Sequence, residues 1–339
     1  MGKIKITDIA KQAGLSITAV SLILNNKPCR ISEEKKALVR DIAQKNHYVA
    51  NQVARSLATN KTNMLALILP DIQNIFFSSL ASIIELSCRE QGYSLLITTS
   101  HDLYKDDKTL LRNIETRGVD GIFYIPGSES YQNRAKLIKQ LDNMTVPYVM
   151  VDRTFSEINC DKVRFDNEEG AYQAVTHLLT MGHRKIACVY RPDPIGNSRS
   201  RLDGYLKAMK EFDCEVKESY LQEGDYRFAG GYNAACKILD SDTTATFICN
   251  DMMTIGFLKK LFEMKLKVPR DYSIVSYDDS LKDYLLEVEL TTIAQNTLKL
   301  GETACKLLIE RLDGKRKEAS EIVFQPELII RNSVKHISS

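Results

Sequence analysis

Apolar runs of strand length alternate with amphipathic runs of helix length over most of this chain. The strand candidates are residues 64–69, 94–98, 121–125, 147–151, 185–190, 245–250 and 273–277. The helical patterns lie near residues 76–91, 104–117, 132–142, 168–181, 199–212, 228–239, 251–264 and 297–313. Alternation at this spacing is typical of parallel, doubly wound α/β sheets. One sheet would not comfortably hold so many units, so we expect an α/β core with two lobes.

Polar and aromatic side chains gather where several of these strands end. Pro70–Phe77 follow the strand candidate 64–69, Asp152-Arg153 follow 147–151, and Asp278-Asp279 follow 273–277. Asn250-Asp251 lie at the end of the strand candidate 245–250. Ligands of parallel α/β sheets bind beyond the carboxyl ends of the strands. The pattern therefore predicts a ligand site at these ends.

The first sixty residues have a different character and predict a helix-turn-helix. Thr7 and Ser16 are placed to cap two short helices through their hydroxyls. Gly14 stands where the first helix must end in a left-handed conformation. A third helix is expected from Ser32 to about Asn46. A helix-turn-helix of this kind is typical of proteins that read DNA.

Charge separates the same segment from the rest of the chain. Residues 1–61 hold eleven Lys and Arg against four Asp and Glu, a net of +7. Since the whole chain carries +2, the remainder carries −5. A basic head on a mildly acidic body favours binding of phosphates by the head alone.

Several protein classes are disfavoured by the sequence. No apolar stretch approaches the roughly 18–20 residues of a membrane span, and no apolar signal-peptide segment follows Lys3 and Lys5. The eight cysteines are scattered, and the five histidines lack metal-ligand spacing. No nucleophile–base constellation is readable, and no glycine-rich phosphate loop follows the first core strand. We expect a cytoplasmic protein that is not an enzyme and has no cofactor and no metal.

An ordered series of short elements carries a resemblance to a known family. The helix-turn-helix is followed by Tyr48-Val49-Ala50-Asn51 and by Asp71–Phe77, and then by five further elements in the family's order. These are Val151–Arg153, Gly182–Ile186, Arg201–Tyr205, Cys249–Asp251 and Ser276–Asp279. Over nearly its whole length the chain resembles the lac/galactose-repressor family of transcription regulators.

The resemblance implies an architecture. An all-α helix-turn-helix head (residues 1–50) would be joined by a hinge helix and linker (51–61) to a core of two periplasmic-binding-protein-like lobes. The first lobe would take residues 62–163 plus 294–325 and the second 164–293 plus 326–339. The chain would cross between the lobes near residues 163–166, 292–295 and 324–327. The tail shows no leucine heptad, so we expect a homodimer rather than a tetramer.

For the head, the resemblance implies that the second helix reads the major groove of near-palindromic operator DNA. The candidate DNA-contacting residues of the head and hinge are Thr7, Ser16, Ile17, Thr18, Ser21, Leu22, Asn25, Arg30, Asn51, Ala54 and Leu57. Leu57 matches the family's wedge, which opens a base step in the minor groove. Leu22 stands where members often carry an arginine that reads guanine, and Ala50 replaces a proline. We therefore expect an operator that differs from the common consensus.

For the core, the resemblance implies a small-molecule effector between the lobes. The candidate effector residues are Asp71, Asn74, Phe76, Phe77, Asp152, Asn197, Arg201, Tyr226, Asn250, Asp278 and Gln295. Carboxylate, amide and guanidinium groups beside an aromatic face suit polyhydroxylated ligands, because each hydroxyl both donates and accepts. A sugar or sugar derivative is the favoured effector, and turn capping is the alternative role for Asn74, Asp152 and Gln295.

Some alternatives stay open at this point. The effector could be a purine or nucleoside, and it could act as an inducer or as a co-repressor. A protein partner could also dock on the first lobe, as in catabolite-control members of the family. A transport solute-binding protein would share the two lobes, but it would not carry the head.

Overall fold

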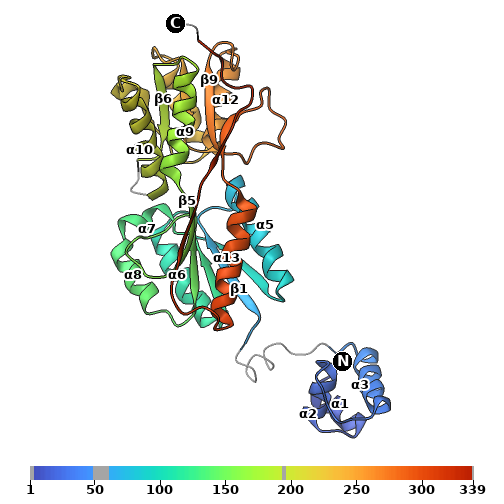
Figure 1. The fold of residues 1–339 in the computed structure, drawn as a ribbon. Helices are drawn as coiled ribbons and strands as arrows, with labels where there is room; N and C mark the ends of the chain where they lie inside the picture. The colour runs from blue at the N-terminus through green and yellow to red at the C-terminus, as the bar shows by residue number, and fades with distance from the viewer. Residues whose placement is uncertain (1–3, 49–60, 193–195, 338–339) are drawn as a thin grey trace. The chain divides into compact units, whose positions relative to one another are not determined.

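The computed structural model describes residues 4–48, 61–192 and 196–337 and divides the chain into two compact units, 1–62 and 63–339 (Figure 1). The described residues of the first unit form the helices α1 (Ile6–Ala13), α2 (Ile17–Leu24) and α3 (Glu33–Lys45). They enclose a small apolar core that includes Ile9, Val20 and Val39. This arrangement confirms the helix-turn-helix and the third helix predicted from the sequence.

The caps of the first unit confirm two predictions and correct a third. Gly14 ends α1 with φ +60°, and the Ser16 hydroxyl accepts a hydrogen bond from the Ala19 N–H at 3.2 Å. The predicted Thr7 cap is wrong, because α1 already begins at Ile6 and Lys5 is its N-cap residue. The Asp8 carboxylate instead accepts from the Lys5 N–H at 2.9 Å. An acid in the first turn supplies both the hydrogen bond and the charge that a helix N-terminus favours.

The first sheet of the second unit has the strand order β11-β5-β4-β3-β1-β2, and all its neighbouring pairs are parallel. Its strands are β1 (Met64–Leu69), β2 (Ser94–Thr99), β3 (Gly121–Tyr124), β4 (Tyr148–Val151), β5 (Asp161–Phe165) and β11 (Glu321–Phe324). Helices α5 (Ile75–Glu90) and α13 (Thr297–Leu312) share one apolar cluster with the sheet. A second cluster joins the sheet to α6 (Tyr104–Thr116), α7 (Ser128–Gln132) and α8 (Arg134–Asp142). We call this sheet and its helices the first lobe.

The second sheet has the order β12-β10-β9-β8-β6-β7 and is parallel except for the short strand β12. Its strands are β6 (Ile186–Tyr190), β7 (Leu221–Glu223), β8 (Ala245–Ile248), β9 (Ser273–Asp278), β10 (Thr291–Ala294) and β12 (Glu327–Ile329). The helices of this second lobe are α9 (Asn167–Thr180), α10 (Gly196–Glu211), α11 (Phe228–Ile238) and α12 (Asp251–Glu263), with a single 3-10 turn, η1 (Glu218–Tyr220). Within the described residues, no helix has the length and apolar character needed to cross a membrane.

The chain passes between the two sheets after β5, after β10 and after β11 (Figure 1). Two doubly wound parallel-sheet lobes are thus confirmed, and every strand candidate of the sequence is present. The pattern missed β5, β7, β10, β11 and β12, which have only three to five residues each. It also missed the short helix α7 and began the next helix at residue 132, whereas α8 begins at Arg134. Short strands at sheet edges and crossings carry too few residues for a period to emerge.

Candidate functional site

Helix α2 turns one face into the core of the head and leaves its N-terminal side chains in solvent. Val20 and Ile23 are buried, whereas Ile17 is 49% exposed and Thr18 is exposed beside it. Thr7, Ser16 and Arg30 are also exposed, and Ser21 and Leu22 are half-buried. The Asn25 side-chain amide donates to the Ser21 carbonyl at 2.8 Å and so helps to end α2. An exposed apolar side chain at a helix start suits contact with a thymine methyl in a major groove.

The predicted hinge residues Asn51, Ala54 and Leu57 lie outside the described residues. Their predicted roles stay predictions.

Arg201 on α10 is the centre of the polar groups between the lobes. Its Nε donates to the Asn167 Oδ1 at 2.8 Å, and its Nη1 donates to the Cys249 carbonyl. Its Nη2 lies 3.5 Å from the Asp278 Oδ1, and the guanidinium stacks 3.7 Å from the centre of the Tyr277 ring. Arg201 is 3% exposed, so each of these contacts is made away from water. The arrangement fixes a buried positive charge at the end of β9.

Asp278 and Gln295 form the next link. Asp278 ends β9 with φ +105°, which turns its carboxylate away from the regular strand direction. The Gln295 Nε2 donates to the Asp278 Oδ1 at 2.8 Å from the point where the chain passes back to the first lobe. Burial raises the pKa of Asp278 to about 6, although the charge of Arg201 opposes this shift.

Asp152 and Arg153 supply the first-lobe side, immediately after β4. Asp152 has φ +61° and is 3% exposed, and burial raises its pKa against the opposing charges of Arg153 and Arg201. The Arg153 Nη1 lies 3.0 Å from the Asp102 Oδ1 and donates to the Pro126 carbonyl at 3.3 Å. Its guanidinium lies 5.2 Å from the centre of the Phe77 ring. The two residues set a carboxylate and a cation side by side in a water-poor layer.

Asp102 joins the lobes, and sequence reasoning missed it. Its Oδ1 accepts from the Ser128 N–H at 3.0 Å and from the Ser128 hydroxyl at 2.7 Å. Its Oδ2 accepts from the Arg191 Nη1 of the second lobe at 3.3 Å. Burial alone would raise the pKa of Asp102, but Arg153, Ser128 and Arg191 outweigh it and hold the pKa well below its usual value. Its position could have indicated the site, because Asp102 lies three residues after β2, at the carboxyl end of the strand like the other site residues.

Tyr226, Asn250 and Asn197 complete the second-lobe side. The Asn250 Nδ2 donates to the Tyr226 carbonyl at 3.1 Å, while its Oδ1 caps α12 through the Met253 N–H at 3.0 Å. The Tyr226 ring centre lies 5.9 Å from the Arg201 guanidinium and 6.0 Å from that of Arg191. Asn197 is buried at the start of α10.

These contacts run without a break from one lobe to the other. We define the inter-lobe cluster as the linked residues Asp102, Arg153, Arg191, Arg201, Tyr226, Asn250, Asp278 and Gln295. To these we add the buried Asp152, next to Arg153 in the chain, and the buried Asn197, one turn before Arg201 on α10. Among the described atoms, five buried polar atoms of the cluster have no hydrogen-bond partner: Asp152 Oδ1, Arg153 Nε, Asn197 Oδ1, the Tyr226 hydroxyl and Gln295 Oε1. Leaving a buried polar atom unpaired costs about 1–3 kcal/mol. Three acceptors, one donor and one hydroxyl that can do either match a small ligand rich in hydroxyl groups.

Three predicted effector residues have other contacts in the structure. Asp71 pairs with Arg227 of the second lobe at 3.3 Å in a partly exposed position. The side-chain Oδ1 of Asn74 accepts from the Phe76 N–H at 3.0 Å and so caps α5, which is the capping role considered from the sequence. Phe76 lies in the apolar cluster of the first lobe, with its ring centre 5.4 Å from that of Phe77. Phe77 contacts the cluster, because its ring lies against the guanidinium of Arg153.

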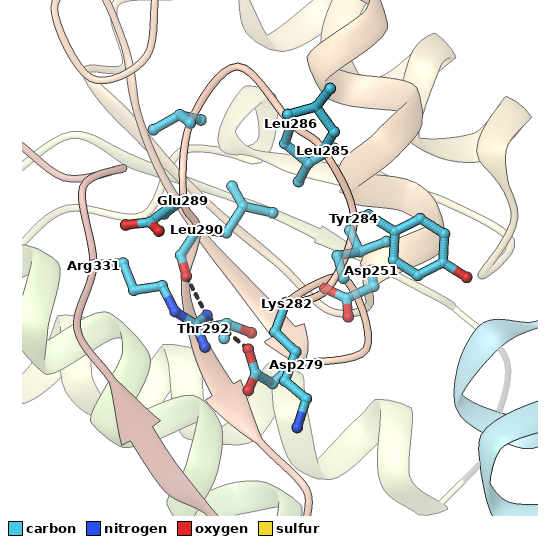
Figure 2. Close-up of a pocket in the computed structure, with 12 residues that line it drawn as sticks. Asp251, Asp279, Lys282, Tyr284, Leu285, Leu286, Glu289, Leu290, Thr292 and Arg331 are labelled. Atoms are coloured by element: carbon cyan, nitrogen blue, oxygen red, sulfur yellow. Dashed lines mark hydrogen bonds and ion pairs between the residues drawn. The ribbon is translucent and has the colours of Figure 1, made fainter.

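A separate pocket of about 270 Å³ lies in the second lobe beside β10 (Figure 2). Arg331 crosses it and binds both the Asp279 carboxylate, at 2.6 Å, and the Leu290 carbonyl. Asp251 borders the same pocket and accepts from the Ser276 hydroxyl and the Ser280 N–H, each at 2.6 Å. Across the described ranges, no group of three or more His, Cys, Asp or Glu side chains is arranged to hold a metal ion.

Comparison with known protein families finds a match for each of the two parts of the chain. Residues 5–51 match the model of the bacterial regulatory proteins of the lacI family, and residues 175–334 match a periplasmic binding protein-like domain. The chain is 32% identical to the HTH-type transcriptional regulator DegA of Bacillus subtilis, over 99% of this chain and 100% of that protein. It is 33% identical to the HTH-type transcriptional repressor PurR of Pasteurella multocida, over 97% of this chain and 98% of that protein.

Two solved structures extend this comparison. A LacI family transcriptional regulator from Enterococcus faecium with bound ribose has a TM-score of 0.73 and 31% identity, covering 81% of this chain and 100% of that one. The lac repressor dimer bound to operator and the anti-inducer ONPF has a TM-score of 0.86 over 98% of this chain and 100% of that one. Its 22% identity supports the fold alone. The relatives over nearly the full chain and the two matching domains establish that this protein belongs to the lacI family of DNA-binding transcription regulators and is not an enzyme.

Proposed function

We propose that this regulator is a cytoplasmic repressor whose affinity for operator DNA is controlled by a small sugar bound at the inter-lobe cluster. The observation that carries the proposal is the set of unpaired buried polar atoms contributed by both lobes. A ligand that pairs these atoms binds the closed arrangement of the lobes better than an open one. It therefore shifts the population of the two arrangements.

The charges of the cluster favour an uncharged ligand. Asp278 is held by Arg201 and Gln295, and Asp102 occupies both Arg153 and Arg191. A phosphate or carboxylate on the ligand would have to compete with these carboxylates for the same guanidinium groups. Hydroxyl groups fit the remaining atoms, because each can donate to an oxygen and accept from Arg153 Nε. The Enterococcus faecium relative with bound ribose supports a neutral sugar of similar size.

A nucleobase or nucleoside is the second candidate for the effector. The Tyr226 ring lies close to two guanidinium groups, and a planar base could stack on it. Such a base would use the amide oxygens of Asn197 and Gln295 as acceptors for its ring or amino N–H groups.

A thermal-shift screen of the full-length protein separates these candidates. Neutral pentoses and hexoses, their phosphates, and purine bases and nucleosides are each added at equal concentration. A ligand that binds only the folded state raises the melting temperature with its concentration. We expect a neutral sugar to raise it and its phosphate ester to have no effect. A shift by purines alone would replace the sugar, and a shift by no small molecule would favour control by a protein partner.

For the DNA-binding side, we propose that α2 lies in the major groove with Ile17 and Thr18 against base edges. Their exposure and the +7 charge of residues 1–61 support this role. We also propose that residues 51–61 form the hinge and that two chains bind one near-palindromic operator as a homodimer. Leu57→Ala tests the hinge, because loss of a wedge lowers both specific affinity and DNA bending. Unchanged affinity and bend angle in a gel-phasing assay would leave Leu57 without a wedge role.

A further inference from the structure

The first lobe carries a groove between α6 and α8, and almost all residues that line it have polar or charged side chains. Its lining residues on α6 are Tyr104, Lys105, Lys108, Thr109, Arg112 and Glu115, and those on and just after α8 are Lys136, Lys139, Gln140 and Asn143. The groove has a volume of about 680 Å³, within the range of roughly 300–1,000 Å³ that small-molecule sites occupy. Figure 1 shows the two helices on the same side of the first sheet. We call this surface the basic groove.

The two walls of the groove are held together from below. Leu111 and Ile114 of α6 share an apolar cluster with Leu137 and Leu141 of α8. The Gln140 Nε2 donates to the Lys108 carbonyl at 3.0 Å, which ties the helices at mid-length. At one end, the Glu115 carboxylate accepts from the Thr145 N–H and from the Thr145 hydroxyl, each at 2.9 Å. The groove is therefore a fixed feature of the lobe, and its single lining acid already has partners.

Five cationic side chains converge on the groove, all of them exposed. Lys105, Lys108 and Arg112 lie at positions i, i+3 and i+7 on one face of α6 and span about 10 Å. Lys136 and Lys139 lie at i and i+3 on the facing side of α8. None of the five forms an ion pair with a carboxylate of the described ranges 4–48, 61–192 and 196–337. This density of unpaired cations raises the local concentration of anions.

The lining favours a small polyanion over a macromolecule. A docked protein helix needs apolar anchors for its affinity, and the lining holds one aromatic residue, Tyr104, with no aliphatic one. Duplex DNA is convex and rigid, and it would reach the rims of the groove without filling it. A compact molecule with several negative charges can contact cations from both walls at once. We propose that the basic groove binds a small molecule carrying at least two phosphate groups, such as a nucleoside polyphosphate.

The number of phosphates follows from charge. One phosphate group carries about −1.5 to −2 at pH 7, so two or three of them balance five cations. A monophosphate would leave most of the cations unmatched and would bind weakly. This site is separate from the inter-lobe cluster, and its existence does not depend on the identity of the effector there.

Calorimetric titration of inorganic tripolyphosphate into the full-length protein at low salt tests the proposal. Two variants remove the charge of one wall each: Lys108→Glu with Arg112→Glu, and Lys136→Glu with Lys139→Glu. A matched control, Lys210→Glu with Lys237→Glu, makes the same charge change at exposed positions of α10 and α11. A head control, Lys11→Glu with Lys35→Glu, removes charge from the other basic region. Melting curves check that each variant is folded.

We expect each wall variant to weaken tripolyphosphate binding at least tenfold, and both controls to change it less than twofold. ATP should follow tripolyphosphate, and inorganic phosphate should bind at least tenfold more weakly. Equal affinity of the wall variants and the wild type would overturn the proposal, as would a loss seen only in the head control. Hexaglutamate and a non-operator DNA duplex are tested in the same way. If either binds more tightly than tripolyphosphate and its binding is lost in the wall variants, the groove is assigned to a protein or to DNA and the proposal is overturned.

Discussion

The head and the inter-lobe cluster differ in how they present the side chains proposed to bind their ligands. The head exposes side chains from one continuous segment, and its contacting helix presents Ile17 and Thr18 to solvent. The cluster buries side chains from segments as far apart in the chain as Asp102 and Gln295. Exposed groups lose little when their partner is absent, whereas buried unpaired groups carry a free-energy cost that a ligand removes. The comparison teaches that the proposed DNA contacts of the head are additive surface features, while the proposed effector contacts of the cluster are coupled to the stability of the core.

The largest effect should be seen in the response of the head to salt. A protein that makes six to ten phosphate contacts loses about 10³–10⁵ in DNA affinity between 50 and 200 mM salt. With +7 on residues 1–61, a dimer should fall in this range. Fluorescence anisotropy with operator DNA measures the slope, and effector affinity over the same salt range is the control, because its contacts are buried. A nearly salt-independent operator affinity would mean that the head is not the main contact surface.

The next effect concerns the centre of the cluster. Arg201→Ala removes the partner of the buried Asp278 and leaves the Cys249 carbonyl and the Asn167 amide oxygen without their donor. Breaking a buried pair in this way costs about 3–5 kcal/mol, so the core should unfold at a clearly lower temperature and effector binding should be lost. The matched control is Arg199→Ala on the same helix, whose exposed pair with Asp203 is worth less than about 1 kcal/mol. Equal melting temperatures for the two variants would contradict a central role for Arg201.

A smaller effect should appear as a pH dependence of the second lobe. Burial, followed by the charge of Asp278, raises the pKa of Asp251 to about 8, so the folded lobe keeps a proton that the unfolded chain loses near pH 4. Stability should therefore fall as pH rises toward 8, by up to about 1.4 kcal/mol per pH unit, and level off above it. Burial lowers the pKa of His183 to about 4, which has the opposite sign but acts only below pH 6.5.

Above pH 6.5 His183 no longer contributes, so the difference between the wild type and Asp251→Asn from pH 6.5 to 8.5 reports on Asp251, while the raised pKa values of Asp152 and Asp278 affect both proteins. Denaturant unfolding of the wild type and of Asp251→Asn across this range measures the slope. We expect the stability of the variant to decline less steeply with pH than that of the wild type. Parallel curves would show that Asp251 is ionised in the folded protein.

The smallest effects compare two ion pairs that both bridge the lobes. Arg191→Ala removes a largely buried contact to Asp102, and we expect about a tenfold loss of effector affinity, equal to about 1.4 kcal/mol. Arg227→Ala removes an equally long contact to Asp71, but the arginine is 54% exposed, so its loss should cost less than about 1 kcal/mol. Calorimetric titration of the effector measures both. A larger loss of effector affinity in Arg227→Ala than in Arg191→Ala would show that burial does not decide which of the two ion pairs matters more.

Much of the candidate site was predictable because it lies at strand ends. Asp152, Asn250 and Asp278 each follow or end a strand, and period and composition place strands well when they are long and apolar. Asp102 and Arg191 also follow strands, but a single charged residue after a strand is not distinctive until its partner is known. Asn74 was assigned to the ligand site by its neighbours in sequence, and its hydrogen bond in the structure caps α5.

The sequence by itself determined the three-helix head, the alternation that builds two parallel-sheet lobes, and the charge that separates them from the head. These properties depend on local periods, caps and composition, which residues close in sequence decide. The tertiary structure alone decided which charged groups meet between the lobes and which are left without a partner. It also joined Asp102 to Arg191 across the lobes and set the cations of α6 beside those of α8. Such pairings depend on how distant strands and helices pack, and no period along the chain encodes them.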